Sequence, residues 1–150
     1  MREINYFKIM ETPADILRNA ISLKTDIGNN SLRVEVEDTA QLIPDKCPWI
    51  GIYLSSWETP WEEEKIGGST PHTTYLEIEL WLYEFALENR QGAILRDRLM
   101  QKVKEVLKNN RKINNTVLIS RFEGGEFDNA YAETGFFKGV SIKLKCEVRE

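Results

Sequence analysis

Residues 74–85 decide the fold of this chain, and they read TYLEIELWLYEF. Side chains of a β-strand point alternately to the two faces of its sheet. One face of this segment carries a row of apolar residues, namely Leu76, Ile78, Leu80 and Leu82. The other face changes from charged to aromatic along the strand, through Glu77, Glu79, Trp81, Tyr83 and Phe85. The first face predicts a packed core, and the second predicts water at one end and another surface at the other.

Helical patterns lie on both sides of this strand. Thr12 is a good N-cap and Pro13 suits the first helical position, so a helix is predicted from there to about residue 23, fading over residues 26–30. A second helix is predicted over residues 91–109, ending at two asparagines. Its buried stripe comprises Leu95, Leu99, Val103, Val106 and Leu107. Its lysines and arginine, Arg96, Lys102, Lys104 and Lys108, point toward solvent.

Further alternating segments predict strands over residues 32–37, 49–54, 117–122 and 136–149, with a polar, glycine-bearing loop over residues 123–135. Nearly adjacent strands are joined by loops rather than by crossover helices. This order predicts an α+β fold, a largely antiparallel β-sheet with two α-helices packed on one face. A chain of 150 residues is long enough to bury one core, so residues 1–150 are predicted to form a single domain.

Composition excludes some classes of function. The net charge is −4 and the basic residues form no block, which argues against a dedicated DNA-binding module. The sequence has no apolar run long enough to cross a bilayer, and its first residues lack the apolar core of a signal peptide. We therefore expect a cytoplasmic protein that has no contact with a membrane. Cys146 continues an apolar alternation and is predicted to be buried, whereas Cys47 precedes a proline in a turn, and no disulfide is expected.

Signals for catalysis are weak. His72 is the only histidine and has no cysteine near it, so a solvated loop residue is the better interpretation. The stretch at residues 124–127, GGEF, has one acid fewer than the diguanylate cyclase signature and is interpreted as a turn. We predict no enzyme activity, no cofactor and no metal. An enzyme would need convergent carboxylates, and the group to inspect is Glu77, Glu79, Glu126 and Asp128.

Two places predict contact with partners. The connection over residues 55–73 is long for a compact domain, and such loops are often functional. It carries two tryptophans and three consecutive acids, namely Trp57, Trp61, Glu62, Glu63 and Glu64. The acids are either a solvated run or, with the tryptophans as anchors, a partner-binding site. The aromatic row Trp81, Tyr83 and Phe85 either packs under another element or forms a subunit interface.

Several segments taken together carry a resemblance to a known family. They are residues 75–80, the helix over residues 94–107 with the asparagines after it, residues 117–119, and residues 139–144. In this order they resemble the tail terminator (tail completion) family of long-tailed bacteriophages, over nearly the whole chain. The shared features are patterns rather than fixed residues, and the loop rich in tryptophan and glutamate departs from them.

The resemblance implies a structural virion protein with an α+β sandwich fold and no catalytic residues. Its partners would be further copies of itself in a hexameric ring, the tail tube protein, the head-tail connector protein, and DNA that passes through the lumen without specific binding. It would be assembled in the host bacterial cytoplasm and end in the virion tail. Two rival functions are another phage neck or tail-tube component, and a monomeric ligand-binding domain with an apolar pocket between sheet and helices.

Overall fold

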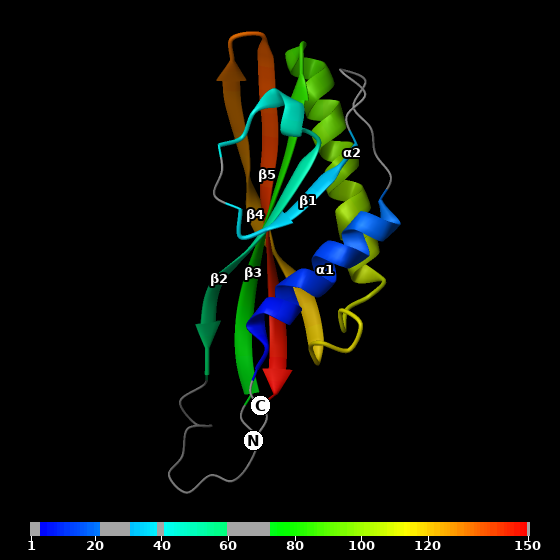
Figure 1. Ribbon diagram of the computed structural model, residues 1–150, viewed down its shortest axis with the longest axis vertical. Helices are drawn as coiled ribbons and strands as arrows, with labels where there is room; N and C mark the ends of the chain where they lie inside the picture. The colour runs from blue at the N-terminus through cyan, green and yellow to red at the C-terminus, as the bar shows by residue number, and fades with distance from the viewer. Residues whose placement is uncertain (1–3, 22–30, 39–40, 60–72, 150) are drawn as a thin grey trace, which may run out of the picture.

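The computed structural model describes residues 4–21, 31–38, 41–59 and 73–149. Its elements in chain order are α1 (Tyr6–Ala20), β1 (Arg33–Val36), a 3-10 turn (Pro44–Lys46), β2 (Trp49–Glu58), β3 (Thr73–Ala86), α2 (Asn89–Lys108), β4 (Ile119–Ala132) and β5 (Gly135–Arg149). The α2 helix runs along the long axis of the sheet, and α1 crosses it obliquely (Figure 1). The predicted α+β fold is confirmed.

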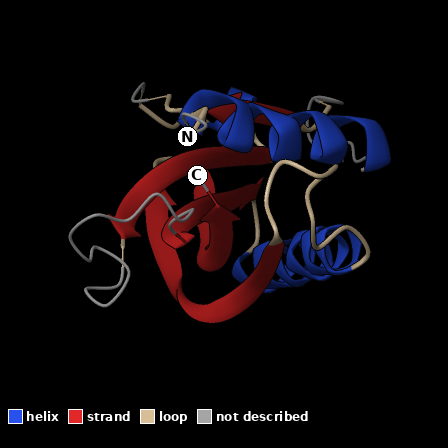
Figure 2. Cartoon of the chain, turned by 90° about the horizontal axis from the view of Figure 1, so that it is seen from below, coloured by secondary structure: helices blue, strands red, loops and turns tan. Residues whose placement is uncertain are grey.

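The five strands form one mixed sheet in the order β1-β2-β3-β5-β4. The pairings β2–β3, β3–β5 and β4–β5 are antiparallel, whereas β1 and β2 run parallel. The sheet is thus largely antiparallel with one parallel edge. Its long strands curl strongly when they are seen end-on (Figure 2). β1 and β4 are the two edge strands, so each of them pairs with a single neighbour within the sheet.

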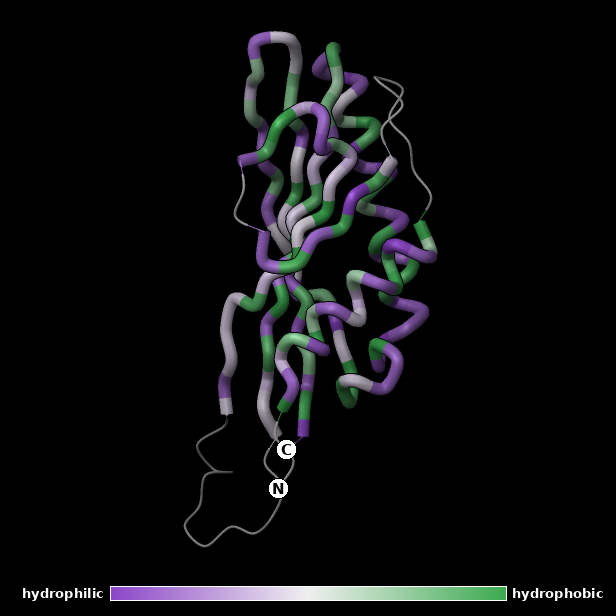
Figure 3. Tube along the Cα trace, in the orientation of Figure 1, coloured by the Kyte–Doolittle hydropathy of each residue, from purple (hydrophilic) through white to green (hydrophobic). Residues whose placement is uncertain are grey.

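The leucine row of β3 lies at the centre of the core, as its alternation predicted. Leu80 pairs with Ile52 of β2 on one side and with Ile142 of β5 on the other, so apolar residues meet in register. Side chains from both helices, Leu17 and Leu99 among them, belong to the same buried cluster. Hydrophobic and hydrophilic residues alternate along the central strands (Figure 3). Burial of this continuous apolar face is the main contribution to the stability of the fold.

Helix α1 begins at Tyr6, about two turns before the predicted start at Pro13. Asn5 is its N-cap, and the Asn5 side chain accepts a hydrogen bond from the backbone N–H of Lys8. Pro13 lies inside the helix, where it removes one backbone donor. Ile9 and Met10 are buried in the core, so packing of the first turns offsets that cost. The prediction of a start at Thr12 relied on local signals and was wrong.

The loop predicted over residues 123–135 is instead the second half of β4 and a tight turn into β5. The register shifts between Phe122 and Gly124, so Glu123 forms a β-bulge. Gly124 has a φ of 124°, which favours glycine. A Cβ on Gly125 would lie 1.7 Å from the carbonyl oxygen of Ser141. The two glycines therefore serve a bulge within a continuous strand, a role that glycines often have in strands.

Candidate functional site

The sheet face opposite the leucine row carries a hollow that we call the aromatic hollow. It has a volume of about 510 Å³. Its principal lining residues come from four strands and are Trp49, Tyr53, Glu79, Trp81, Tyr83, Asp128 and Phe137. The register places Tyr83 between Trp49 and Gly139, and Gly139 beside Asp128. The hollow therefore depends on the pairing of strands that are distant in sequence.

Two glycines make room for the rings of the hollow. A Cβ on Gly139 would lie 2.3 Å from the ring of Tyr83, and a Cβ on Gly51 would lie 2.3 Å from the ring of Trp49. Both distances are far below van der Waals contact, so only glycine lets each ring lie against the backbone. The Tyr83 ring thus extends from β3 across β5, with one face on the sheet and the other turned outward.

The Tyr83 side chain is positioned by a hydrogen bond and lies beside a parallel ring. Its hydroxyl donates a 2.7 Å hydrogen bond to Oδ2 of Asp128 on β4. Burial, then the carboxylate of Asp128, raises the pKa of Tyr83 well above its ordinary value, so the hydroxyl stays a donor. The rings of Trp81 and Tyr83 are parallel within 5°, with centroids 6.3 Å apart. The arrangement gives fixed ring surfaces beside a fixed carboxylate.

Beside the hollow, β1 and the turn after it carry an acid pair. A hydrogen bond with Asp38, followed by burial, raises the pKa of Glu35 above its ordinary value. Lys46 lies 3.5 Å from the Asp38 carboxylate. The Tyr53 hydroxyl donates a hydrogen bond to the backbone carbonyl of Asp38, which joins this turn to β2.

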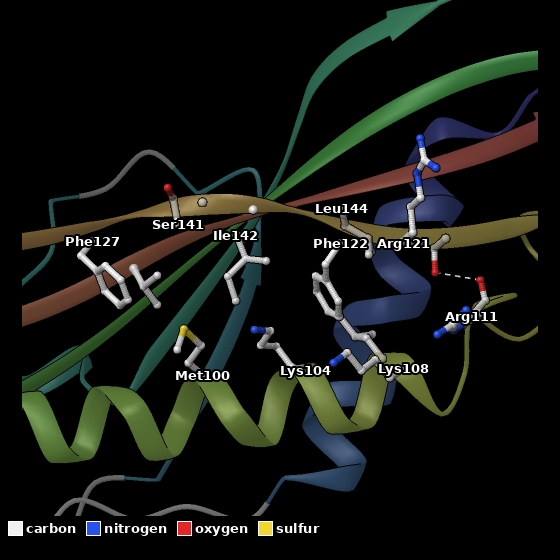
Figure 4. A pocket seen from close by; sticks show the side chains of 15 residues that line it. Met100, Lys104, Lys108, Arg111, Arg121, Phe122, Phe127, Ser141, Ile142 and Leu144 are labelled. Carbon is white, nitrogen blue, oxygen red and sulfur yellow. Dashed lines mark hydrogen bonds between the residues drawn. The ribbon is translucent and has the colours of Figure 1, made fainter.

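A second depression lies between α2 and the strands β4 and β5, and we call it the basic groove (Figure 4). Its volume is about 550 Å³. The apolar side chains that line it include Met100, Leu107, Phe122, Phe127, Ile142 and Leu144. The charged side chains that line it are Lys104, Lys108, Arg111 and Arg121, and no carboxylate of the described residues lines it. The turn after α2 is tied to β4 because the Ser120 hydroxyl donates to the carbonyl of Arg111.

The groove exists because α2 packs mainly on β3 and β5 and leaves β4 outside its cover. Two aromatic side chains on β4, Phe127 and Tyr131, are consequently exposed. The guanidinium of Arg96 on α2 lies 4.7 Å from the centroid of the Phe127 ring, which bridges the gap in one place.

The residues predicted to bind partners have different positions. Trp57 ends up on β2 and is 68% exposed, so it is available to a partner. Trp61, Glu62, Glu63 and Glu64 lie outside the described residues. Trp81 and Tyr83 are half-buried and line the aromatic hollow. Phe85 is buried in a small cluster with Cys47 and Phe137, so only the first two of the three aromatics offer ring surface to a neighbour.

Trp49 and Tyr53 were not predicted as site residues. Gly51, which lies between them on the same face of the strand, was an available signal. A glycine within a strand often marks a place where another group approaches the backbone closely, and here the neighbouring rings can lie over it. Lys104 and Lys108 were predicted only to point toward solvent. Their part in the groove depends on where β4 lies, which the helix pattern alone does not indicate.

The inspected carboxylates divide into separate groups. Glu79 and Asp128 line the same hollow, whereas Glu77 lies 3.8 Å from Lys143 and Glu126 is exposed. Within the described ranges, no group of three or more His, Cys, Asp and Glu residues could hold a metal ion. Cys47 and Cys146 are both buried free thiols, and burial raises the pKa of each to about 12. Burial of Cys146 is confirmed.

No protein-family model matches the chain, and no curated protein matches it. Of the helices that the structure describes, none has the length and apolar character needed to cross a membrane.

Proposed function

We propose that this chain is a structural subunit that assembles into a homo-oligomeric ring, caps a phage tail tube, ends tube polymerisation and forms the head-tail joining surface. The observation that carries the proposal is the outer edge of β4, which we call the open edge. β4 is 14 residues long and pairs only with β5, so its other side lies at the margin of the sheet. Phe127 is 61% exposed there and Tyr131 is 80% exposed. Uncovered strand edges with apolar side chains favour pairing with another chain.

The opposite margin of the sheet offers a second uncovered stretch. β1 pairs with β2 only from Trp49 to Ile52, so residues 55–58 at the far end of β2 lie beyond it. This stretch carries the exposed Trp57. Contacts between two unlike surfaces are head-to-tail contacts, and they close into a ring when the rotation between subunits allows it. A ring of six copies is what the family resemblance implies.

Charge supports the same function. A ring through which DNA passes should not hold phosphate tightly, and the chain carries a net charge of −4. The tail tube protein and the head-tail connector protein are the partners that this function requires. Trp57 and the acids that follow it are the proposed contact with the tube or with a neighbouring subunit.

The test combines light scattering with electron microscopy in the presence of tail tubes. We expect the protein to bind tube ends as a ring. In a pull-down with this protein as bait, we expect the tube protein or the connector protein to be recovered. Phe127→Asp together with Tyr131→Asp should abolish this while leaving the thermal transition nearly unchanged, because both side chains are exposed. Trp57→Ala should likewise reduce capping without unfolding the chain.

Phe7→Asp is the matched control. Phe7 is 64% exposed, much like Phe127, but it lies on helix α1 rather than on a strand. It should therefore leave capping intact. A strictly monomeric protein that never decorates tube ends would refute the proposal. Recovery of a neck or tube component in place of the tube end would indicate another position in the virion.

The basic groove favours a second candidate, a monomeric domain that binds an anionic amphiphile. The groove combines an apolar floor with four cationic side chains, which suits a carboxylate on a hydrocarbon chain. Calorimetry with dodecanoate tests it. Saturable binding that is lost in Lys104→Gln with Lys108→Gln, by a protein that caps no tubes, would favour this function over the ring.

A further inference from the structure

The aromatic hollow presents ring faces that no cation of the described chain covers. The Tyr83 ring has one face on Gly139 and its other face outward, and the Trp81 ring is parallel to it. A cation within about 6 Å of such a ring is attracted by the negative π face. Among the described residues, neither ring has a lysine or arginine over it.

The charges of the hollow have the sign that a cation requires. Of the residues that the structure describes, Glu79 and Asp128 are the charged ones that line it, and none of them is basic. Within the part of the chain that the structure describes, neither carboxylate forms an ion pair. Oδ2 of Asp128 accepts the Tyr83 hydroxyl, and Oδ1 accepts no hydrogen bond from a described residue.

Elsewhere, the chain supplies cations to similar groups itself. At the other end of the same sheet face, Lys145 lies 5.1 Å from the centroid of the Tyr75 ring, and Lys143 lies 3.8 Å from Glu77. On the helix side, Arg96 covers Phe127. The hollow also places rings beside carboxylates, but among the described residues no cation lies over its rings, and Lys143, which is opposite Glu79 on β5, forms its ion pair with Glu77 instead. This difference is the charge complementarity that identifies its occupant.

We propose that the aromatic hollow binds the guanidinium group of an arginine side chain carried by a protein partner. A guanidinium is planar, stacks on aromatic rings, and donates paired N–H groups to a carboxylate. Parallel rings beside Asp128 and Glu79 match all three properties, whereas a lysine ammonium has the charge but neither the planar surface nor the paired donors. The assignment stands on the geometry of the hollow and does not depend on ring assembly.

The experiment titrates ¹⁵N-labelled full-length protein with the peptide acetyl-Gly-Arg-Gly-amide and follows the tryptophan indole N–H signals by NMR. Trp81→Phe and Trp49→Phe assign those signals. We expect saturable shifts of the Trp81 signal. The same peptide with citrulline, which has arginine's shape without its charge, should bind at least about tenfold more weakly, and the lysine peptide should also bind more weakly.

Single charge-removing variants test the carboxylates. Asp128→Asn and Glu79→Gln should each weaken binding of the arginine peptide about fivefold to tenfold while the thermal transition is retained. The matched control is Glu147→Gln, an acid on the same sheet face at the end paired with Tyr75. It should leave the affinity unchanged.

Four outcomes would overturn the proposal. They are equal binding of the citrulline peptide, tighter binding of tetramethylammonium or the lysine peptide than of the arginine peptide, unchanged affinity in both Asp128→Asn and Glu79→Gln, and no saturable shift at all. Ring assembly is measured separately at tube ends. The result of the peptide titration therefore neither supports nor contradicts the ring proposal.

Discussion

The two edges of the sheet differ in how far side chains cover their backbone. At the edge formed by β1, the guanidinium of Arg18 donates to the carbonyl oxygen of Val34 through Nε at 3.1 Å and Nη2 at 2.6 Å. Just beyond β1, the Glu37 carboxylate accepts the backbone N–H of Leu54 at 3.0 Å. We call this the sealed edge. At the open edge, β4 carries exposed aromatic side chains beyond the cover of α2.

This difference shows which surface the fold protects. An unpaired strand edge is a template for association, and proteins that stay apart usually block it. Here Arg18 of helix α1, which is 16 positions before Val34 in the sequence, supplies the block for β1. β4 has a bulge and several charges that limit pairing near Glu123, but residues 125–132 continue as regular strand. In the proposed ring, this asymmetry would give each subunit one favoured direction of assembly.

The largest effect is expected from detaching the open edge. Gly125→Ala places a Cβ 1.7 Å from the carbonyl oxygen of Ser141, which is backbone and cannot rotate away. We expect a loss of about 3 kcal/mol in the free energy of unfolding, because overpacking of this kind forces the backbone to shift. Chemical denaturation measures the loss, and hydrogen exchange should show β4 opening first.

Asn129→Ala is the control, since Asn129 is exposed on the same strand. It should change stability by less than about 0.5 kcal/mol. If Gly125→Ala is as stable as this control, the close approach of β4 and β5 at the bulge is not as described.

A smaller effect is expected from opening the sealed edge. Arg18→Ala removes the donors to Val34 and the 2.9 Å ion pairs with Glu11 and Asp15. We expect a loss of about 1–2 kcal/mol in the free energy of unfolding, because the part-buried carbonyl loses charge-assisted bonds while the exposed ion pairs contribute little. Association through β1 should also rise.

Arg18→Lys sharpens this prediction. Lysine keeps the charge and hence the ion pairs, but it lacks the planar fork that donates twice to one carbonyl. The free energy of unfolding of Arg18→Lys should lie between that of Arg18→Ala and that of the unchanged protein, as measured by urea titration. Equal stability of Arg18→Lys and the unchanged protein would mean that charge alone, and not the seal, is what matters.

The sequence predicts the centre of this fold better than its margins. The leucine row of β3 and the stripe of α2 follow strict periods of two and 3.6 residues, and both are buried as predicted, except that Val106 is only partly buried. The second half of β4 was missed because Gly124 and Gly125 are typical of turns, and only the pairing with β5 turns them into a bulge. The early start of α1 was missed because burial of Ile9 overrides the signal of Pro13.

The candidate site shows the same limit. Trp81 and Tyr83 were predicted from one strand, but their neighbours Trp49 and Asp128 come from strands far away in sequence. Strand register brings these residues together, and a local pattern contains no information about register between distant strands. Cys146 shows the converse, since one strand's alternation was enough to predict its burial.

The smallest effect concerns pH at the sealed edge. The pKa of Glu35 is raised in the folded state, chiefly through its hydrogen bond with Asp38. The folded chain therefore binds this proton more tightly than the unfolded chain, whose carboxyl has the ordinary pKa of 4.5. The stabilisation is fully present below pH 4.5 and is lost as pH rises through the raised pKa.

Glu35→Gln cannot ionise, so its stability relative to the unchanged protein should rise between pH 4 and pH 7, by less than the effect of Arg18→Ala. Thermal unfolding across that range measures the difference, and Asp38→Asn should reduce the pH dependence in the same direction. Parallel pH profiles for Glu35→Gln and the unchanged protein would contradict this prediction, because they would show that Glu35 contributes nothing to the pH dependence of stability.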